Sequence, residues 1–501
     1  MPKEELVNLA LRRSVFFPTA EIYPAAPGGF YDYGPIGVKM RNAIVSYWRA
    51  ALVEANDFVE VSGAQVLPKE VFKASGHLEN FNDPLIQCKK CHSLHRADQL
   101  VSDKLKQVVA ETIPLNELEA LIEKHKIPCP KCGTKEFLPV KQFNMMVSAP
   151  IGVEANANDP GTFLRPEACQ NIFLDFDRLY KTSRKKLPLG IAQAGQAFRN
   201  EIAPRNAFLR AREFGQMDIE VFFDPAKVNE GVNWEEAKNY KLNIAPPEKE
   251  SKLVSCDEAL KKKMASGKLI LYYMAKLQQW FEALNIPVQD MRFREQGDGK
   301  PFYAKDAWDF EVRTEDGWKE LVGVHYRTDY DLKGHSKESK KELGVKEEGM
   351  KESIVPHVFE LSMGIDRTLQ VLLELAYRKE KRGAEERIYL KLAPQLAPFQ
   401  CAVFPLVNKD GLWEQSQSVL QLLKHSGLSA VFDDSGSIGR RYARVDEVGV
   451  PYAITIDYDT MKDSTVTIRD RDSLAQKRAK ILQLPETIRS LYSGKQSFSQ
   501  L

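Results

Sequence analysis

Alternating hydrophobic and polar residues in the middle of the chain predict a long β-hairpin. The stretches IAQAGQAF and GQMDIEVFF alternate as half-buried strands do, and they flank the segment Phe198–Phe214. That segment, FRNEIAPRNAFLRAREF, therefore lies at or near the turn of the hairpin. Its polar residues include two glutamates and four arginines: Arg199, Arg205, Arg210 and Arg212.

The composition of this turn suits a polyphosphate ligand. A guanidinium raised on a rigid sheet can bond an oxyanion through two parallel hydrogen bonds. Glutamates among the arginines could accept a hydrogen bond from an exocyclic amine or hold a magnesium ion. From the residues alone, the alternative is a solvated hairpin that carries ordinary salt bridges.

Other hydrophobic patterns predict a protein of mixed helices and strands. Met40, Ile44, Trp48 and Leu52 form one helical face, and FVEVSGAQVLP reads as a strand that follows it. DAWDFEVRT and GWKELVGVHYRTDYDL predict two more strands of one sheet. HVFELSMGIDRTLQVLLEL predicts a strand, a glycine turn and a strongly apolar helix. The stretch at about 226–270 is rich in Lys and Glu and predicts a charged, solvated insertion.

A domain boundary is expected at about residue 393. From 394 to 501 the pattern becomes strand, helix, strand, helix and strand, which predicts a parallel α/β domain. A local basic patch within it could meet RNA phosphates, and a charged helix start without RNA contact fits equally well. The patch consists of Arg440, Arg441 and Arg444.

Length, composition and charge narrow the class of protein. A chain of 501 residues with 43 % hydrophobic and 28 % charged residues is typical of a soluble globular protein of two or three domains. No apolar run approaches a membrane span and the first residues lack a signal-peptide core, so we expect a cytoplasmic protein. With 71 basic and 69 acidic residues, the net charge of +2 predicts only local contacts with nucleic acid.

Four of the seven cysteines predict a structural zinc site. They form two C-x-x-C pairs, Cys88/Cys91 and Cys129/Cys132, and two such pairs complete a tetrahedral thiolate shell. A closed shell leaves no open position for catalysis. One of three histidines could replace a cysteine, and four unliganded thiols remain the alternative; the histidines are His92, His95 and His125.

Several of these stretches together resemble the class II aminoacyl-tRNA synthetases in their glycyl-tRNA synthetase form. FRNE, a loop and REF resemble motif 2, FVEVSGAQVLP sits where motif 1 belongs, and Gly364–Arg367 matches the Gly-x-x-Arg of motif 3. EIYPAAPGGFYDYGPIGVKMRN and KASGHLENFNDP resemble the opening of the same enzymes. SIGRRYARVDEVGVPYAITID resembles the anticodon-binding domain of the glycyl, histidyl, prolyl and threonyl enzymes. The resemblance covers nearly the whole chain.

The resemblance implies an α+β fold. Residues 1–393 would form the class II antiparallel sheet flanked by helices, with a zinc-knuckle insertion at about 86–140, and residues 394–501 an α/β anticodon-binding domain. It also implies a homodimer that activates glycine with ATP and Mg²⁺, transfers it to tRNA(Gly), and makes diadenosine tetraphosphate as a further product. The rival is an inactive, synthetase-like RNA-binding or accessory protein. A narrower alternative is the same fold activating another small amino acid.

By the same resemblance, the turn and motif 3 would bind ATP. Arg199 would hold the α-phosphate, Glu201 would meet the adenine amine, and Phe214 would stack on the purine. Arg367 would hold the γ-phosphate, and Glu320, with Glu360, would carry magnesium; Arg199, Glu201 and Arg367 are the implied catalytic residues. The full implied ATP set is Arg199, Asn200, Glu201, Leu209, Arg210, Arg212, Phe214, Glu320, Leu321, Gly364, Asp366 and Arg367.

The resemblance also implies a glycine pocket made largely of acids. Three carboxylates around one ammonium make charge-assisted hydrogen bonds and fill the space that a Cβ would need, so no editing domain is expected. The implied glycine set is Arg96, Glu167, Phe214, Gln216, Asp218, Glu360 and Ser362. Departures from the family pattern occur at Ala168, Cys169 and Asn171 within the usual RPETAQG, at Asp218 for glutamate, at Val324-His325 for Ala-Asp, and at Leu361 for proline.

Overall fold

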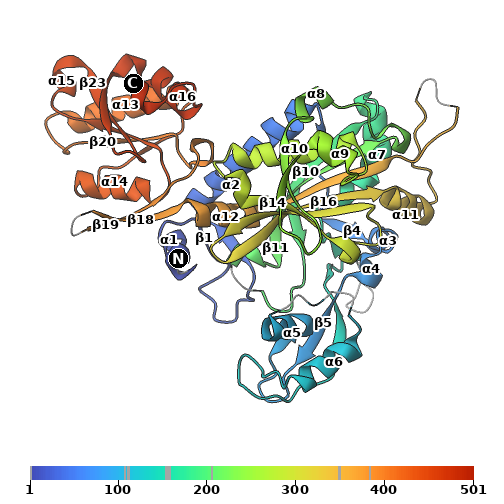
Figure 1. The fold of residues 1–501 in the computed structure, drawn as a ribbon. Helices are drawn as coiled ribbons and strands as arrows, with labels where there is room; N and C mark the ends of the chain where they lie inside the picture. The colour runs from blue at the N-terminus through green and yellow to red at the C-terminus, as the bar shows by residue number, and fades with distance from the viewer. Residues whose placement is uncertain are drawn as a thin grey trace.

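A large sheet organises the protein. The computed structural model describes residues 3–106, 109, 113–152, 160–204, 207–347, 351–382 and 385–501, so Arg205 of the predicted turn lies outside the described residues. The main sheet has nine strands in the order β13-β12-β14-β15-β16-β17-β11-β10-β3 (Figure 1). Its strands are β3 (Val59–Glu60), β10 (Leu189–Phe198), β11 (Glu213–Phe223), β12 (Lys241–Ala245), β13 (Lys252–Ser255), β14 (Met291–Glu295), β15 (Asp306–Thr314), β16 (Gly317–Thr328) and β17 (His357–Gly364).

The main sheet is antiparallel except at β3–β10 and β12–β14, and the hairpin predicted from alternation is β10–β11. On β11, Met217, Ile219 and Val221 enter the largest hydrophobic core with helices α2 (Pro35–Trp48), α10 (Lys268–Glu282) and α12 (Ile365–Ala376). Phe222 points to the opposite face, where it packs with Phe176 of α7 (Gln170–Ser183). The period of two along the strand therefore separates two cores, one on each face.

Two sequence predictions fail in this part of the fold. FVEVSGAQVLP is two short strands, β3 in the main sheet and β4 (Val66–Pro68) in a small sheet with β8 (Val147–Ser148) and β9 (Thr162–Leu164). Between β3 and β4, a Cβ on Gly63 would lie 2.2 Å from the Asn171 side chain, so the chain bends against α7 at that residue. The charged stretch at 226–270 supplies β12, β13 and α9 (Cys256–Lys261) to the main sheet and core, because Leu242, Ile244 and Val254 are buried.

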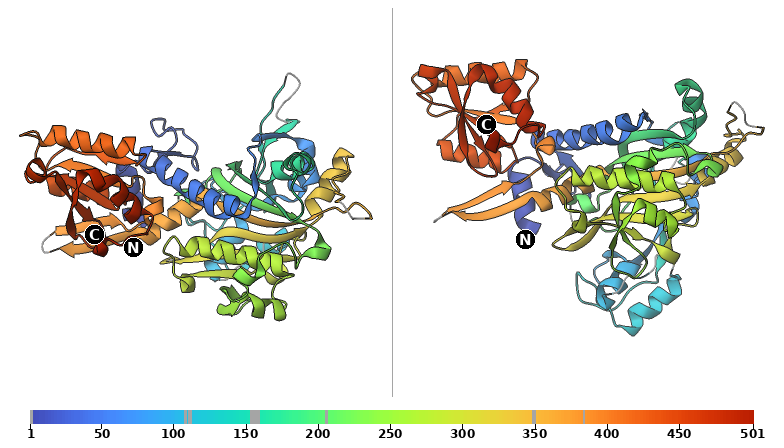
Figure 2. Two further views of the ribbon diagram at one scale, coloured as in Figure 1. Left: turned by 90° about the horizontal axis from the view of Figure 1, so that it is seen from above. Right: turned by 45° about the horizontal axis from the view of Figure 1, so that its top comes forward.

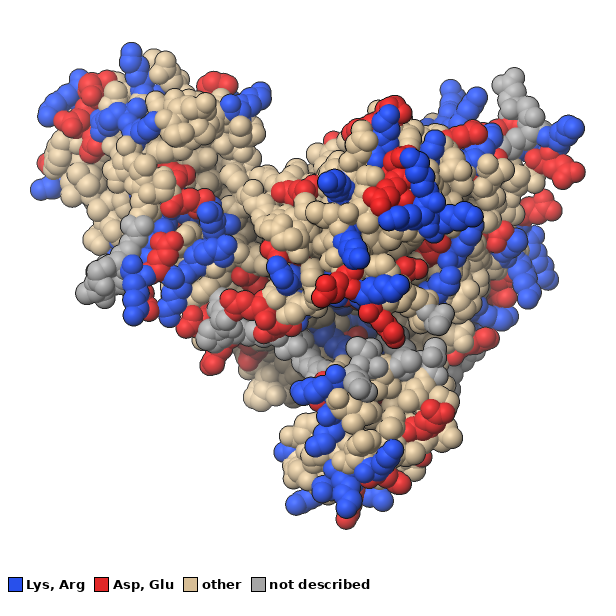
Figure 3. Space-filling model, in the orientation of Figure 1, with Lys and Arg blue, Asp and Glu red and all other residues tan. Residues whose placement is uncertain are grey.

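A smaller module carries the C-x-x-C pairs below the main sheet (Figure 1). It contains β5 (Asn82–Gln87), β6 (Leu94–Arg96), β7 (Lys141–Asn144), α5 (Ala97–Leu105) and α6 (Leu115–Lys124). Ile86, Val101 and Leu118 belong to a separate core within the module. In Figure 3 a hollow with basic and acidic side chains along its edge lies between this module and the main body.

The C-terminal part forms its own five-stranded sheet, in the order β21-β20-β22-β23-β24. As predicted, β20 (Cys401–Pro405), β21 (Ala430–Phe432) and β22 (Tyr452–Ile456) are parallel, whereas β23 (Thr465–Asp470) and β24 (Gln476–Lys480) add an antiparallel edge. Helices α13 (Leu412–His425), α14 (Ile438–Asp446), α15 (Thr460–Asp463) and α16 (Leu484–Tyr492) complete it. Figure 2 shows it at one end of the molecule, beside the hairpin β18 (Tyr377–Arg382)–β19 (Glu385–Leu390) and α1 (Lys3–Arg12).

The remaining elements are short and surround the main sheet. They are β1 (Phe16–Pro18), β2 (Tyr31–Tyr33), α3 (Lys69–Ala74), α4 (His77–Asn80), α8 (Trp234–Ala237) and α11 (Tyr330–Ser339). Among the residues that the structure describes, none of the helices combines the length and apolarity needed to cross a bilayer.

Candidate active site and cysteine cluster

Polar side chains line one face of the central strands, opposite the largest hydrophobic core. Register places Asp218 of β11 beside Ser362 of β17, and Glu220 beside Glu360. Ser362 donates a hydrogen bond of 2.7 Å from Oγ to Asp218 Oδ1. Gln216, two residues before Asp218, donates to Ser362 Oγ at 3.4 Å and accepts from the Ala168 amide at 2.8 Å. Four of the residues predicted to bind glycine therefore form one group: Gln216, Asp218, Glu360 and Ser362.

Glu360 is held in place by two basic side chains that sequence reasoning missed. Arg327 donates to both Glu360 oxygens at 3.0 and 3.1 Å, and His325 Nδ1 lies 2.6 Å from Glu360 Oε2. Arg327 also forms a bidentate pair with Asp331 at 2.7 and 2.9 Å, and its side chain is only 3 % exposed. Burial opposes ionisation of Glu360, but Arg327 and His325 outweigh it and lower the pKa. Glu360 is therefore a carboxylate.

Glu167 approaches the same group from the segment before α7. Its carboxylate lies 3.4 Å from His77 Nε2 and 3.8 Å from the Arg199 guanidinium. Burial opposes its ionisation, yet His77, Arg327 and Arg199 together hold the pKa of Glu167 well below its usual value. The pKa of Glu360 is in turn affected by the charge of Glu167, so the two carboxylates share one environment.

Burial raises the pKa of two acids of this face, Asp218 and Glu220. Burial raises the pKa of Asp218 to about 8; the charges of Glu360 and Glu167 add to the rise, and the Ser362 hydrogen bond and Arg165 oppose it. Burial, followed by the charge of Glu360, raises the pKa of Glu220 well above its usual value. Within the described structure, Asp218 Oδ2 is buried without a hydrogen-bond partner. When Asp218 is ionised, it thus has an acceptor left over for a cationic ligand.

The described arginines of the predicted turn have different partners: Arg199 and Arg210 lie beside aromatic or acidic side chains, whereas Arg212 bonds backbone carbonyls. Arg199 lies with its guanidinium 5.3 Å from the ring centres of both Phe81 and Phe214, at the edge of the acidic group. Arg210 pairs with the buried Glu201 at 3.0 Å. Arg212 instead donates to the Glu201 carbonyl and to the Gly28 carbonyl, both at 2.9 Å, so it holds the loop together.

Motif 3 places its arginine beside the predicted magnesium ligand. Arg367, at the start of α12, donates to the Glu320 carbonyl at 3.1 Å and lies 3.6 Å from the Glu320 carboxylate. Gly364 pairs with Gln216, two residues after Phe214, so Arg367 and the Arg199–Phe214 stack lie at the same end of these strands. Asp366 accepts hydrogen bonds from the Gly215 amide at 2.7 Å and from the Tyr33 hydroxyl, which fixes α12 against β11.

Several predicted contacts are occupied by the protein itself. Leu321 is 2 % exposed in the largest core, and Leu209 packs against that core. Arg96 pairs with Asp83 at 3.0 Å and with Asp98 at 3.1 Å. The Asn200 amide donates to the Met145 carbonyl at 2.8 Å, which anchors the loop after β10.

Residues that depart from the family pattern are packed into the interior of the fold. The Asn171 side-chain oxygen Oδ1 accepts a hydrogen bond from Arg165 at 2.8 Å, and the same side chain packs against Gly63. Ala168 and Val324 are fully buried, and Leu361 is 3 % exposed in the largest core. These substitutions therefore leave the charged groups of the site in place.

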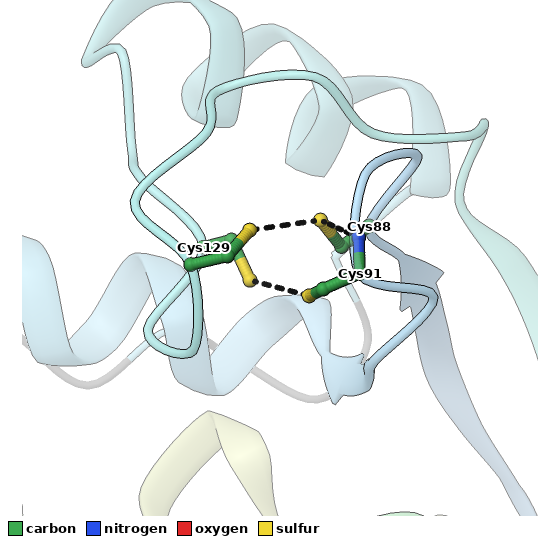
Figure 4. Close-up of side chains that lie close together, drawn as sticks. Cys88, Cys91 and Cys129 are labelled. Carbon is green, nitrogen blue, oxygen red and sulfur yellow. Dashed lines mark hydrogen bonds between the residues drawn. The ribbon is translucent and has the colours of Figure 1, made fainter.

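The four cysteines meet in one cluster. Cys88 Sγ lies 3.6 Å from Cys132 Sγ, and Cys91 Sγ lies 3.7 Å from Cys129 Sγ. Figure 4 shows Cys88 and Cys91 pointing toward the Cys129 side of the cluster. Thiolates on one tetrahedral zinc ion are about 3.8 Å apart, so the donor set and spacing fit zinc. His95 Nε2 lies 3.6 Å from Cys129 Sγ, but neither it nor His92 or His125 belongs to the group, which consists of the four cysteines.

The predicted basic patch on α14 is only partly available to RNA. Arg440 is exposed. Arg441 is 3 % exposed and donates to the carbonyls of Asp434 and Gly436, both at 2.8 Å. Arg444 pairs with Asp433 at 2.6 Å. The inward position of Arg441 contradicts its assignment as an RNA contact.

The fold and this site together define a class II aminoacyl-tRNA synthetase. Residues 153–243 match the family model for the tRNA synthetase class II core domain (G, H, P, S and T), and residues 400–491 match the anticodon binding domain. The predicted fold class is thereby confirmed.

Full-length relatives give the family. The chain is 34 % identical to the glycine–tRNA ligase of Methanothrix thermoacetophila, with 99 % of this chain and 98 % of that protein covered. It is 36 % identical to that of Methanocaldococcus jannaschii, with 97 % and 98 % covered. It is 37 % identical to that of Thermococcus sibiricus, with 98 % and 99 % covered. The chain belongs to the glycine–tRNA ligase family, which confirms the resemblance read from its motifs.

Proposed function

We propose that this chain carries out the glycine–tRNA ligase reaction in the cleft where Glu167, Asp218 and Glu360 approach Arg199. Glycine would be activated by ATP to glycyl-adenylate and then passed to tRNA(Gly). The observation that carries this proposal is the buried acidic group beside an arginine held between two aromatic rings. An acid-lined recess suits the ammonium group of an amino acid that has no side chain, and the arginine suits a phosphate.

The acidic group would recognise the glycine ammonium. Asp218 Oδ2 is a buried acceptor, and Glu167 and Glu360 are ionised by their basic neighbours. Ser362 and Gln216 would orient Asp218 through their hydrogen bonds. We expect the side chains around this recess to exclude a Cβ, so alanine and serine would be rejected by collision.

The arginines would neutralise ATP during activation. The glycine carboxylate attacks the α-phosphorus, the bond to the bridging oxygen breaks, and pyrophosphate leaves with its charge. Arg199 would hold the α-phosphate, Phe214 would stack on the purine, and Arg367 would hold the γ-phosphate. Such chemistry depends on positioning and charge neutralisation.

Magnesium would be held chiefly by Glu320, since its carboxylate is half exposed beside Arg367. Glu360 is less suited because it is buried and Arg327 and His325 leave it about one acceptor position, whereas Glu320 is open to solvent. Glu320 would thus place a divalent cation near Arg367, and that ion, when bound, would supply positive charge to neutralise the leaving pyrophosphate. Glu201 would meet the adenine amine, with Arg210 as its partner.

In the second step, a hydroxyl of the terminal tRNA ribose attacks the glycyl carbonyl and AMP leaves. We propose that residues 394–501 bind the anticodon, with Arg440 as the exposed cation of the predicted patch. We further propose that residues 1–393 form the catalytic domain, that the four cysteines hold a structural zinc ion, and that the chain works as a cytoplasmic homodimer. Synthesis of diadenosine tetraphosphate stays a prediction.

ATP–pyrophosphate exchange tests the proposal directly. We expect exchange that depends on glycine and is at least about a hundredfold slower with alanine or serine, because exclusion by collision exceeds the discrimination of one methylene. Equal exchange with alanine would refute the acid-lined recess. Absence of exchange with all three amino acids would favour an RNA-binding protein without synthetase activity.

The pKa of Asp218 predicts how glycine binding depends on pH. In the empty recess Asp218 is protonated below about pH 8, whereas an ammonium favours its ionised form, so binding releases a proton. We expect the dissociation constant for glycine to fall by up to about tenfold per pH unit from pH 6 to 8 and to level off above pH 8. Calorimetry in buffers of different ionisation enthalpy measures both effects. The Asp218→Asn variant should lose the proton release, and a flat profile in the parent protein would contradict the assignment.

Lengthening Asp218 by one methylene tests the departure at this position. Asp218 reaches Ser362 but leaves slack toward the ammonium, so Asp218→Glu should lower the KM for glycine by a few fold with kcat nearly unchanged. An unchanged or higher KM would contradict a gap between the Asp218 carboxylate and the glycine ammonium. Asp290→Glu, on an exposed pair with Arg313, is the matched control and should leave KM as it is.

A further inference from the structure

Three metal-ligating side chains meet behind the proposed glycine recess. Cys169 Sγ and one carboxylate oxygen each from Glu220 and Glu360 lie within 4.8 Å of one another, and all three side chains are buried. The group, called the floor cluster below, is assembled from three elements. Glu220 and Glu360 face each other on β11 and β17, and Cys169 is the N-cap residue immediately before α7.

Glu220 is an independent sign that the floor cluster takes a ligand. Its side chain is completely buried, and neither carboxyl oxygen has a hydrogen-bond partner in the part of the chain that the structure describes. Buried polar atoms are almost always hydrogen-bonded, so a buried carboxyl group without a partner is an exception that a ligand would explain. Both oxygens of Glu220 therefore remain available to a metal ion that enters between it and Glu360 and displaces the carboxyl proton.

The third ligand, Cys169, departs from the family pattern. The family pattern RPETAQG has alanine where this sequence has Cys169, so the thiol is an addition to the acids already present. Cys169 lies 3.7 Å from the Glu167 carboxylate and is buried. A sulfur ligand beside carboxylates changes the metal preference of the group from magnesium or calcium toward zinc.

We propose that Cys169, Glu220 and Glu360 bind one zinc ion when the glycine recess is empty. Three protein ligands and one water complete the four-coordinate shell that zinc adopts at open sites. On such an ion a thiolate and a carboxylate oxygen are about 3.5 Å apart and two carboxylate oxygens about 3.3 Å apart, so ligand atoms that now lie within 4.8 Å of one another would close in by about 1.5 Å at most. Glu360 can still take part, because a carboxylate offers about four acceptor positions and Arg327 and His325 use three.

Zinc at the floor cluster would inhibit the enzyme in competition with glycine. This consequence depends on the function proposed above, in which Glu360 receives the glycine ammonium. An ion that takes Glu360 also places a positive charge where the ammonium must bind. Glycine and zinc therefore exclude one another, and glycine protects the enzyme.

Zinc binding by the full-length protein tests the site without reference to activity. Protein whose four-cysteine cluster has been loaded with zinc and then desalted is equilibrated at graded free Zn²⁺, and zinc per chain is counted by mass spectrometry. We expect the parent to bind one equivalent of zinc more than Cys169→Ala does. Any zinc that the variant binds at the floor cluster should have an affinity at least about tenfold lower than in the parent. Glu220→Gln, which keeps the shape of the side chain, should lose the same equivalent.

Cys256→Ala is the matched control. Cys256 is equally buried, but its sulfur faces the Leu271 carbonyl at 3.8 Å, and among the described residues it belongs to no group of metal-ligating side chains. It should retain the extra equivalent, and all three variants should keep glycine-dependent exchange within about twofold of the parent when zinc is buffered to low levels. Equal zinc counts in the parent and Cys169→Ala would overturn the site.

Glycine addition separates this inference from the proposed function. Saturating glycine should release the extra equivalent, and zinc should raise the KM for glycine in the parent but not in Cys169→Ala. If the equivalent is present yet stays bound at saturating glycine, the metal site stands and the competition with glycine is overturned, together with the position of the recess.

Discussion

Replacing Arg199 with alanine is expected to slow glycine-dependent ATP–pyrophosphate exchange by about 100- to 1,000-fold. The guanidinium is held between Phe81 and Phe214 at 5.3 Å from each ring, so it meets a phosphate already oriented. Removing one preorganised donor from a developing charge costs this much in typical enzymes. The loss should appear in kcat/KM for ATP, because Arg199 acts on the phosphate in the transition state.

The fold of the Arg199→Ala variant should survive. Its side chain is partly exposed, and a cation–π contact contributes only about 0.5–1 kcal/mol. Arg313→Ala is a suitable control because Arg313 also lies over an aromatic ring, Trp318, but on β15 and paired with Asp290. Near-normal exchange in Arg199→Ala, or an equal loss in Arg313→Ala, would refute the role assigned to motif 2.

Replacing Arg327 with methionine is expected to lower the free energy of unfolding by about 3–5 kcal/mol. Arg327 is the shared partner of Glu360 and Asp331, and all three side chains are buried. Removing one member of a buried ion pair leaves an uncompensated charge, which accounts for a loss of this size. Chemical denaturation measures it, and the KM for glycine should rise as well because Glu360 loses its orientation.

An exposed pair provides the comparison for Arg327. Arg49 pairs with Glu60 at 2.7 Å, and its side chain is 40 % exposed, so Arg49→Met should cost less than about 1 kcal/mol. If Arg327→Met does not fold, Arg327→Lys keeps the charge but loses the bidentate geometry and should raise the KM for glycine with a smaller loss of stability. A destabilisation of Arg327→Met as small as that of Arg49→Met would show that Glu360 does not depend on this arginine.

The strands of the site could be predicted from the sequence because one face of β11 is apolar and the other is acidic at these positions. Met217 and Ile219 enter the largest core, whereas Asp218 and Glu220 point the other way, and that alternation is visible in GQMDIEVFF. The strand at FVEVSGAQVLP was predicted too long. Its interruption depends on the close approach of Asn171 to Gly63, which no local pattern reveals.

The partners of the predicted residues could not be read from the sequence. Arg327 and Glu360 are 33 residues apart and meet because β16 and β17 pair in a particular register. His77 reaches Glu167 from a different part of the fold. The RTDYDL stretch carried a local signal, since Arg327 and Asp331 are four residues apart, but nothing in it pointed to Glu360.

Charge composition misled in two places for the same physical reason. In residues 226–270 the Lys and Glu residues lie on exposed surfaces, while Leu242 and Ile244 enter the core. On α14, Arg441 turns inward to satisfy carbonyls at the end of its own loop. Composition counts charges, whereas burial depends on where each side chain points.

The central claim is that a phosphate-binding arginine and an acid-lined recess share one cleft. A crystal structure with 5′-O-(glycylsulfamoyl)adenosine, a non-hydrolysable mimic of glycyl-adenylate, tests it most directly. We predict the ammonium within hydrogen-bond distance of Glu167, Asp218 and Glu360, with the sulfamoyl group against Arg199 and the purine on Phe214. A ligand whose ammonium lies away from these three carboxylates would contradict the account.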